Sequence, residues 1–344
     1  MQRPLIRYYG SKYRLAPFII SNFPEHKVYI EPFGGSAGVL LRKPPSWHEV
    51  YNDLDGELYN LFTVLKNPST AAKLKARLSA TPYAKVVYEA SYQPTSEPVE
   101  QAWQFIVRSH LGFSASSCLR KTGFISTSKK ATYMPIKTWP NVPNQIDWYT
   151  ERLQSVAIDN RDALQLIQAH DSEHALFYID PPYLQATRYY NRKKIYRYEY
   201  TPEEHTQMLH LVNNLSGKVV ISGYDNELYN DLLIGWKKVS KNSLTDGRNT
   251  KKEILWIKDN INLQRTAALH TAKIKRSKTE KQIISAIEVL RQANQKVTKT
   301  AVANKLGISR ANLSRRYTHL FVSPLTKDHD TRTDLTETTI DATT

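Results

Sequence analysis

The stretch "ALFYIDPPYL", residues 175–184, decides how the surrounding chain is interpreted. Its first five residues form an unbroken apolar run, which is typical of a short strand buried on both faces of a sheet. Proline has no backbone N–H to give to a neighbouring strand, so the strand must end before Pro181. Asp180 and Tyr183 therefore lie on a stiff corner at the carboxyl end of a strand. In an open α/β sheet, ligands bind at this edge.

The segments on both sides of this stretch alternate between strand and helix. Such alternation predicts a mainly parallel sheet with helices on both faces. The expected strands are 27–33, 49–53, 175–180, 218–224 and 252–258, the expected helices are 55–66, 201–215 and one that opens at 39–43, and a further strand and helix lie within 155–167.

The composition indicates which cellular compartment and which kind of binding partner to expect. The chain has 344 residues and a formal net charge of +16, which favours an anionic partner such as nucleic acid, although a basic soluble surface is the alternative. Cys118 is the single cysteine, so an internal disulfide and a cysteine-based metal cluster are both excluded. No signal peptide and no apolar run of membrane-spanning length, about 18 residues, is found. We therefore expect a cytoplasmic protein that has no membrane partner.

Several polar positions fall where the predicted strands end. "GGSAG" (34–38) is a turn that lets a cofactor approach the backbone, although a tight turn without a ligand fits equally well. Asp53 and Asp162 each follow a predicted strand, where an acid can bind ribose hydroxyls or cap the next helix. After Tyr183, basic and aromatic residues interleave over 184–200, as suits phosphates and stacked bases.

From Tyr8 to Lys258 the chain resembles the D12 class of DNA adenine N6-methyltransferases, the Dam-like family. The resemblance implies a class I S-adenosylmethionine-dependent methyltransferase fold, which is Rossmann-like α/β. It also implies methyl transfer to adenine N6 in double-stranded DNA, with S-adenosyl-L-methionine as the cofactor. Eight segments match in the family's order: "RYYGSK" (7–12), "YIEPFGGSAGVLL" (29–41), "YNDLDGELYNLF" (51–62), "IDNRDAL" (158–164), "YIDPPYL" (178–184), "TPEEHTQML" (201–209), "GKVVISGYDNELY" (217–229) and "TKKEILWIK" (250–258).

The resemblance also implies roles for individual residues. Lys12 lies near the cofactor carboxylate, Asp53 binds the ribose hydroxyls, and Asp162 binds the adenine amino group of the cofactor. The remaining cofactor contacts are Tyr8, Glu31, Pro32, Phe33, Gly34 and Gly35. The target base is held by Asp180, Pro181, Pro182 and Tyr183.

The residue types suit this chemistry. The N6 lone pair of adenine is conjugated into the ring, so the amine is a poor nucleophile. The Asp180 carboxylate and the Pro181 carbonyl can accept the two N6 hydrogens and free that lone pair, and two prolines fix the direction of the carbonyl. Tyr183 offers a ring on which a flipped base can stack. A sulfonium methyl is already activated, so we expect neither a metal nor a covalent intermediate.

Two further regions are expected to contact DNA. Residues 67–150 occupy the place of the family's target-recognition region, where Arg108, Arg120 and Lys121 are candidate contacts and solvated surface charges are the alternative. The stretch associated with GATC-reading relatives is missing, which argues against a GATC target.

We assign the catalytic domain to 1–66 and 151–260.

The C-terminal region resembles bacterial helix-turn-helix modules. Residues 271–323 carry twelve Lys or Arg against two Glu. Ile283, Ile284, Ile287 and Leu290 form one helical stripe, Thr298 caps a short helix, and Gly307 turns the chain. The next helix presents Arg310, Arg315 and Arg316 for docking in a DNA groove. A basic three-helix bundle without DNA is the alternative. Residues 324–344 are expected to be disordered.

Other activities stay open at this point. Cytosine N4 or adenine N6 in RNA are alternative targets, and the acid at position 180 argues against the first of these. A DNA-binding regulator with an inactive methylase half is a third possibility, against which the intact Lys12, Asp53 and Asp180 argue. A cognate restriction enzyme is one candidate partner, and the recognition sequence is not given.

Overall fold

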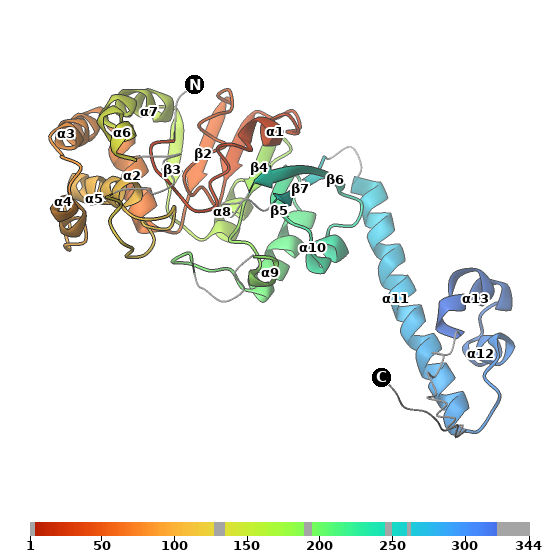
Figure 1. Ribbon diagram of the computed structural model, residues 1–344. Helices are drawn as coiled ribbons and strands as arrows, with labels where there is room; N and C mark the ends of the chain where they lie inside the picture. Colours follow the sequence, from red (N-terminus) through yellow and green to blue (C-terminus); the bar gives the residue numbers. More distant parts are fainter. Residues whose placement is uncertain (1–3, 127–134, 189–194, 245–249, 260–262, 322–344) are drawn as a thin grey trace, which may run out of the picture. The chain divides into compact units, whose positions relative to one another are not determined.

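A computed structural model describes residues 4–126, 135–188, 195–244, 250–259 and 263–321. By their contacts they divide into two compact units, 1–267 and 268–344. A seven-stranded sheet in the order β3-β2-β1-β4-β5-β7-β6 lies at the centre of the first unit (Figure 1). Its strands are β1 (Val28–Glu31), β2 (His48–Asn52), β3 (Val156–Asp159), β4 (Ala175–Ile179), β5 (Lys218–Tyr224), β6 (Lys237–Leu244) and β7 (Thr250–Lys258).

Five strands of the sheet are parallel, as predicted. β1 pairs with both β2 and β4. The strands that follow β1 therefore extend the sheet first on one side of β1 (β2, β3) and then on the other (β4, β5). A ligand crevice forms outside the carboxyl ends of the strands at such a switch point. β7 is antiparallel to β5 and to β6, which the alternating pattern did not predict. β6 itself was missed, because "KKVSKNSL" has the polar composition of an edge strand and lacks an apolar run.

Helices cover both faces of the sheet. On one face Tyr29, Tyr51 and Tyr178 share a core with α1, α2, α3, α5 and α7, and on the other face Ile30 and Phe177 share a core with α8, α9 and α10. The helices are α1 (Ala16–Ile20), α2 (Gly56–Lys66), α3 (Pro68–Ser79), α4 (Lys85–Ala90), α5 (Pro98–Leu111), α6 (Pro135–Thr138), α7 (Ile146–Leu153), α8 (Ala163–Ala169), α9 (Pro202–Asn213) and α10 (Glu227–Leu232). Every residue of β4 is buried, as the apolar run predicted.

Local signals account for the helix starts. Asp55 caps α2, and Thr201 with Glu204 forms a capping box at the start of α9, as their sequences indicate. The helix predicted to open at 39–43 is wrong, because this segment forms successive turns. The N–H of Leu40 donates to the carboxylate of Glu31 instead of to a helix carbonyl, and Pro44 prevents continuation.

The second unit has a small core of its own. α11 (Leu263–Gln292), α12 (Lys299–Leu306) and α13 (Arg310–Arg316) contribute to it buried residues that include Ile283, Ile287 and Leu313. Thr298 caps α12 and Gly307 ends it at φ +64°, as predicted. Ile284 was wrongly placed in the buried stripe and is 44% exposed, because consecutive helical residues point about 100° apart. The predicted tail, 324–344, lies outside the described residues.

Candidate active site

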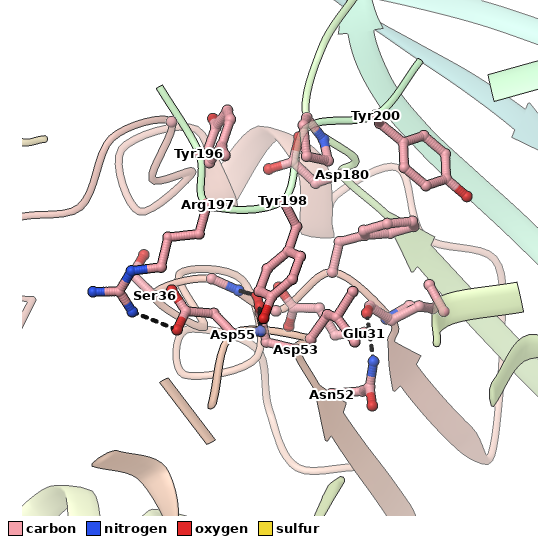
Figure 2. Close-up of a pocket in the computed structure, with 18 of the residues that line it drawn as sticks. Glu31, Ser36, Asn52, Asp53, Asp55, Asp180, Tyr196, Arg197, Tyr198 and Tyr200 are labelled. Carbon is pink, nitrogen blue, oxygen red and sulfur yellow. Dashed lines mark hydrogen bonds and ion pairs between the residues drawn. The ribbon is translucent and has the colours of Figure 1, made fainter. Parts of the chain in front are cut away.

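A cavity of about 390 Å³ opens at the carboxyl ends of β1, β2 and β4 (Figure 2). Its volume is within the range of about 300–1,000 Å³ that small-molecule sites occupy. Among the residues that sequence reasoning proposed, those that line it are Tyr8, Lys12, Glu31, Pro32, Phe33, Gly34, Gly35, Asp53, Asp162, Asp180 and Pro182. Segments far apart in the sequence therefore meet in one site.

The glycine turn after β1 is tightly enclosed. A Cβ atom on Gly34 would lie 2.1 Å from the Tyr51 ring, and Gly35 has φ +49°. The N–H of Gly34 donates to the Asn52 carbonyl at 2.8 Å, which ties the turn to the end of β2. Only glycine fits here without a shift of the neighbouring ring. The result is a bare backbone on the wall of the cavity.

Asp53 braces this turn from the adjacent strand. Its Oδ2 accepts the N–H of Gly35 and its Oδ1 accepts the N–H of Asp55, both at 2.8 Å. Burial nevertheless raises the pKa of Asp53 to about 6, against the lowering effect of these two hydrogen bonds. The carboxylate is therefore ionised at neutral pH but close to its titration range.

Two other acids of the cavity have different roles. Glu31 is 2% exposed and accepts hydrogen bonds from Leu40 N–H and the Tyr29 hydroxyl. Burial raises the pKa of Glu31 to about 8, which favours the protonated form of this side chain at pH 7. Asp162 caps α8 through the N–H groups of Leu164 and Gln165 while it also lines the cavity. The two interpretations of Asp162 are therefore compatible.

Asp180 lies at the end of β4 within a cluster of polar groups. The Lys12 ammonium is 2.8 Å from Asp180 Oδ1, and the Ser222 hydroxyl donates to the same oxygen at 2.8 Å. Among the described residues no donor reaches Oδ2. Burial opposes the charge on Lys12, but the carboxylates of Asp180 and Glu253 outweigh it and raise the pKa of Lys12 above its ordinary value.

The backbone after Asp180 is held by His205 of α9. A carbonyl can only accept, so His205 Nε2 donates to the Pro182 carbonyl at 3.1 Å, and Nδ1 accepts from the Tyr229 hydroxyl at 2.8 Å. Burial lowers the pKa of His205 to about 4, which keeps the ring neutral. Sequence reasoning missed His205 and Ser222. The helix and strand patterns do not show that these two side chains contact the segment that follows β4.

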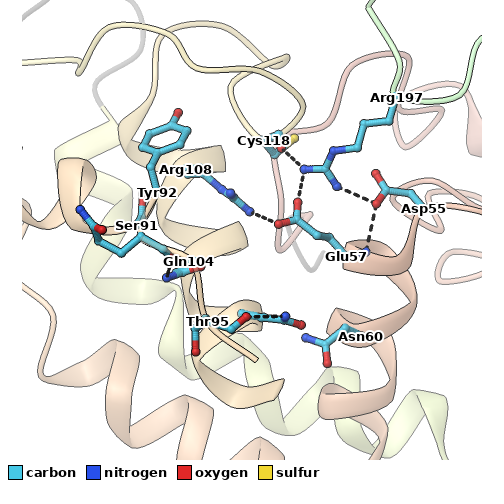
Figure 3. Close-up of polar contacts among 12 residues, drawn as sticks. Asp55, Glu57, Asn60, Ser91, Tyr92, Thr95, Gln104, Arg108, Cys118 and Arg197 are labelled. Carbon is cyan, nitrogen blue, oxygen red and sulfur yellow. Dashed lines mark hydrogen bonds and ion pairs between the residues drawn. The ribbon is translucent and has the colours of Figure 1, made fainter. Parts of the chain in front are cut away.

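Segment 196–200, here called the covering segment, lines one side of the cavity and is tied to α2 (Figure 2). Arg197 donates to Asp55 at 2.7 Å, to Glu57, and to the Cys118 carbonyl at 3.2 Å. The Glu57 carboxylate also accepts a hydrogen bond from the guanidinium of Arg108, on α5, at 2.7 Å (Figure 3). One ion-pair network thus joins the cavity to the region 67–150.

If the cofactor expected from the sequence, S-adenosylmethionine, binds in this cavity, Arg197→Ala should release the covering segment and raise the dissociation constant of that cofactor by roughly tenfold. A charge-assisted hydrogen bond contributes about 1.5–3 kcal/mol, and about 1.4 kcal/mol corresponds to tenfold. Calorimetric titration measures this effect. Arg77→Ala removes an exposed ion pair with Glu100 and is the matched control. Equal affinities in both variants would contradict the assigned role of Arg197.

The candidate DNA contacts lie in different surroundings. Arg108 is 8% exposed and paired with Glu57, so we assign it to the ion-pair network and not to a DNA surface. Arg120 and Lys121 are exposed in a loop that a bridge between Gly112 and Phe124 closes. Arg310, Arg315 and Arg316 are exposed on the second unit. Cys118 is 1% exposed, and burial raises its pKa to about 12, as befits an unreactive thiol.

The sheet order and the cavity at its switch point define an α/β fold of the class I methyltransferase type. The model of the D12 class N6 adenine-specific DNA methyltransferases matches residues 8–246, more than half of the chain. The chain therefore belongs to this family of enzymes, which methylate adenine N6 in DNA with a methyl-donor cofactor. A search of the curated proteins found no match. Of the helices that are described, none is long and apolar enough to cross a membrane.

Proposed function

We propose that this enzyme transfers the methyl group of S-adenosyl-L-methionine to N6 of an adenine flipped out of double-stranded DNA into the pocket of residues 180–183. The observation that carries the proposal is the juxtaposition of the Asp180 carboxylate with a cavity lined by Asp53, Asp162 and the glycine turn. Hydrogen-bond acceptors for a nucleoside and for an amine thus line the same cavity.

The lining of the cavity fits S-adenosylmethionine. Asp53 and Asp162 offer acceptors for hydroxyl and amino groups, and Lys12 is a cation for a carboxylate. The bare backbone at Gly34 and Gly35 allows close approach of the ligand. When bound, this cofactor supplies an electrophilic methyl group on a sulfonium. The protein has only to bind, orient and exclude water around it.

The protein acts on the amine of the target base. Asp180 Oδ2 is the carboxylate oxygen available to accept one N6 hydrogen, since Lys12 and Ser222 both donate to Oδ1. The Pro181 carbonyl accepts the other hydrogen, and His205 fixes the next peptide through Pro182. These acceptors draw the nitrogen toward tetrahedral geometry and free its lone pair, which would form the new N–C bond as the S–CH3 bond breaks; the thioether would leave and one N6 proton would be released. Because they are fixed in advance, no reorganisation is needed during the reaction.

Single-molecule sequencing tests the proposal. DNA is taken from a methylase-free bacterium that expresses the protein, beside the Asp180→Ala variant. We expect N6-methyladenine in one sequence context with the parent chain and none with the variant. A parent chain that binds S-adenosylmethionine and DNA but leaves every base unmodified would contradict the proposal and favour a regulator or an RNA substrate.

We propose two surfaces for DNA. Arg120 and Lys121 lie in the region 67–150 that we assign to target recognition, and Arg310, Arg315 and Arg316 lie on the C-terminal module that we assign to helix-turn-helix binding. Exposed arginines and lysines neutralise phosphates, and arginine can also read guanine edges. We further propose that the enzyme acts in the cytoplasm, with a cognate restriction enzyme as a candidate partner. Cleavage of unmodified but not modified DNA by a neighbouring gene product tests that partner.

Deletion of 271–344 should weaken DNA binding by roughly tenfold or more and leave methyl transfer intact. If the three arginines of the module each neutralise one phosphate, the slope of log K against log salt should fall by about 2–3. Fluorescence anisotropy at several salt concentrations measures both effects. All eight family segments lie before the deletion. Complete loss of methylation in a folded truncation would refute this prediction.

A further inference from the structure

Glu253 is a buried acid within the last of the family segments, 250–258, and neither the resemblance nor the proposed mechanism gives it a role. It lies on β7 opposite Tyr224 of β5 and is 2% exposed. Because β7 runs antiparallel to β5, this early residue of the strand reaches the edge of the sheet where β4 ends. A carboxylate buried there is costly unless it is paired and hydrogen-bonded.

One partner of Glu253, Tyr183, belongs to the proposed base pocket, and the other, Lys12, lines the cofactor cavity. Its Oε1 accepts the hydroxyl of Tyr183, and the same oxygen is 3.7 Å from the Lys12 ammonium. Lys12 in turn lies 4.5 Å from the centre of the Tyr183 ring and 2.8 Å from Asp180 Oδ1. Two acids, one cation and one ring therefore restrain one another.

The charges of this cluster explain why a second acid is useful. With Asp180 as its sole partner, Lys12 would be drawn fully onto the carboxylate that has to accept from the base. Glu253 offers the ammonium a second, competing anion at 3.7 Å. Burial raises the pKa of Glu253, and the Lys12 ammonium and the Tyr183 hydroxyl oppose that shift and favour its ionised form.

The ring of Tyr183 gains a fixed orientation from the same acid. The hydroxyl is anchored on Glu253, and Tyr224 packs edge-on against the ring with 4.9 Å between centres. A stacking surface that is held at its far end keeps its plane when a base arrives, so less ordering is needed during binding.

We propose that Glu253 is a positioning residue of the base pocket, which fixes Tyr183 through its hydroxyl and holds Lys12 so that Asp180 can still accept from the target amine. This proposal rests on the proposed function for the identity of the base. The competing interpretation is an acid that only anchors β7 in the sheet.

Steady-state kinetics of Glu253→Gln separate these interpretations. The amide keeps the shape and removes the charge. We expect kcat to fall by roughly 10- to 100-fold, the scale of a misplacement of about 1 Å. The KM for S-adenosylmethionine is measured beside it, because Lys12, which Glu253 contacts, lines the cofactor cavity. Tyr183→Phe should lower kcat too, and the double variant should lose less than the product of the two effects.

The matched control is Asp225→Asn, which neutralises an exposed acid one residue beyond Tyr224 and leaves kcat unchanged. An anchoring role alone would lower the melting temperature without altering kcat at temperatures where the variant is folded. That outcome, or an unchanged kcat, or fully independent effects of the two substitutions, would overturn the proposal.

A measurement without turnover keeps this inference separate from the proposed function. The 13Cζ resonance of Tyr183, assigned by its disappearance in Tyr183→Phe, should shift in Glu253→Gln and stay in place in Asp225→Asn. A parent enzyme that modifies no DNA contradicts the proposed function, whereas an unmoved resonance overturns the role of Glu253 even when the parent enzyme is active.

Discussion

Asp180→Ala is expected to lower kcat/KM for adenine methylation by roughly 10²–10³-fold, the cost of losing one preorganised group that acts on the reacting atoms. The variant removes the carboxylate oxygen that we propose accepts an N6 hydrogen, so the amine keeps its conjugated, weakly nucleophilic form. Single-turnover methylation of DNA with a labelled methyl donor measures the chemical step directly.

The fold of this variant should persist, because the groups around Asp180 have other partners. Lys12 can turn to Glu253, which is 3.7 Å away, and donates to the Gly10 carbonyl at 3.2 Å. Ser222 remains next to the Tyr178 hydroxyl at 3.0 Å. Asp225→Ala, at the end of the adjacent parallel strand, is the control that should keep full activity. An Asp180→Ala enzyme with parent rates would rule out the proposed acceptor.

Sequence reasoning was strongest where one residue type has a single physical use. Prolines at 181 and 182 end a strand wherever they occur, and the five apolar residues before them can only be buried. The carboxyl end of β4 was therefore predictable without a structure, and so was the cap at Thr201. Burial of Tyr51 against Gly34 was not predictable, because it depends on the pairing of β1 with β2.

The contacts that sequence reasoning could not foresee depend on strand direction and on neighbours far apart in the chain. Glu253 reads as a polar position within a strand until β7 is known to run antiparallel to β5. Arg108 reads as a surface cation until Glu57, 51 positions earlier, is seen beside it. In both cases the sequence indicated the type of secondary structure, but the residue that makes the contact lies in another helix or strand.

Asp53→Asn is expected to raise the dissociation constant of S-adenosylmethionine by roughly 10²-fold at pH 8. The parent carboxylate accepts two backbone N–H groups, from Gly35 and Asp55, and an amide has only one acceptor oxygen. The variant therefore loosens the glycine turn and loses the ionised group that we propose as the acceptor for the ribose. Two charge-assisted hydrogen bonds at about 1.5 kcal/mol each correspond to that change in affinity.

The pH dependence distinguishes this role of Asp53 from damage to the fold. Its pKa is raised to about 6, so the parent protein takes up a proton at Asp53 as the pH falls through 6 and its cofactor affinity should weaken there. The free energy of unfolding changes in the opposite direction: protonation of Asp53 stabilises the fold at low pH, and this stabilisation is lost as the pH rises through 6. Asn cannot titrate, so the variant should bind weakly but evenly between pH 5 and pH 7 (roughly one unit either side of that pKa). Calorimetric titration of cofactor into both proteins across this range decides the matter: parallel pH profiles would mean that another group, and not the Asp53 carboxylate, governs binding.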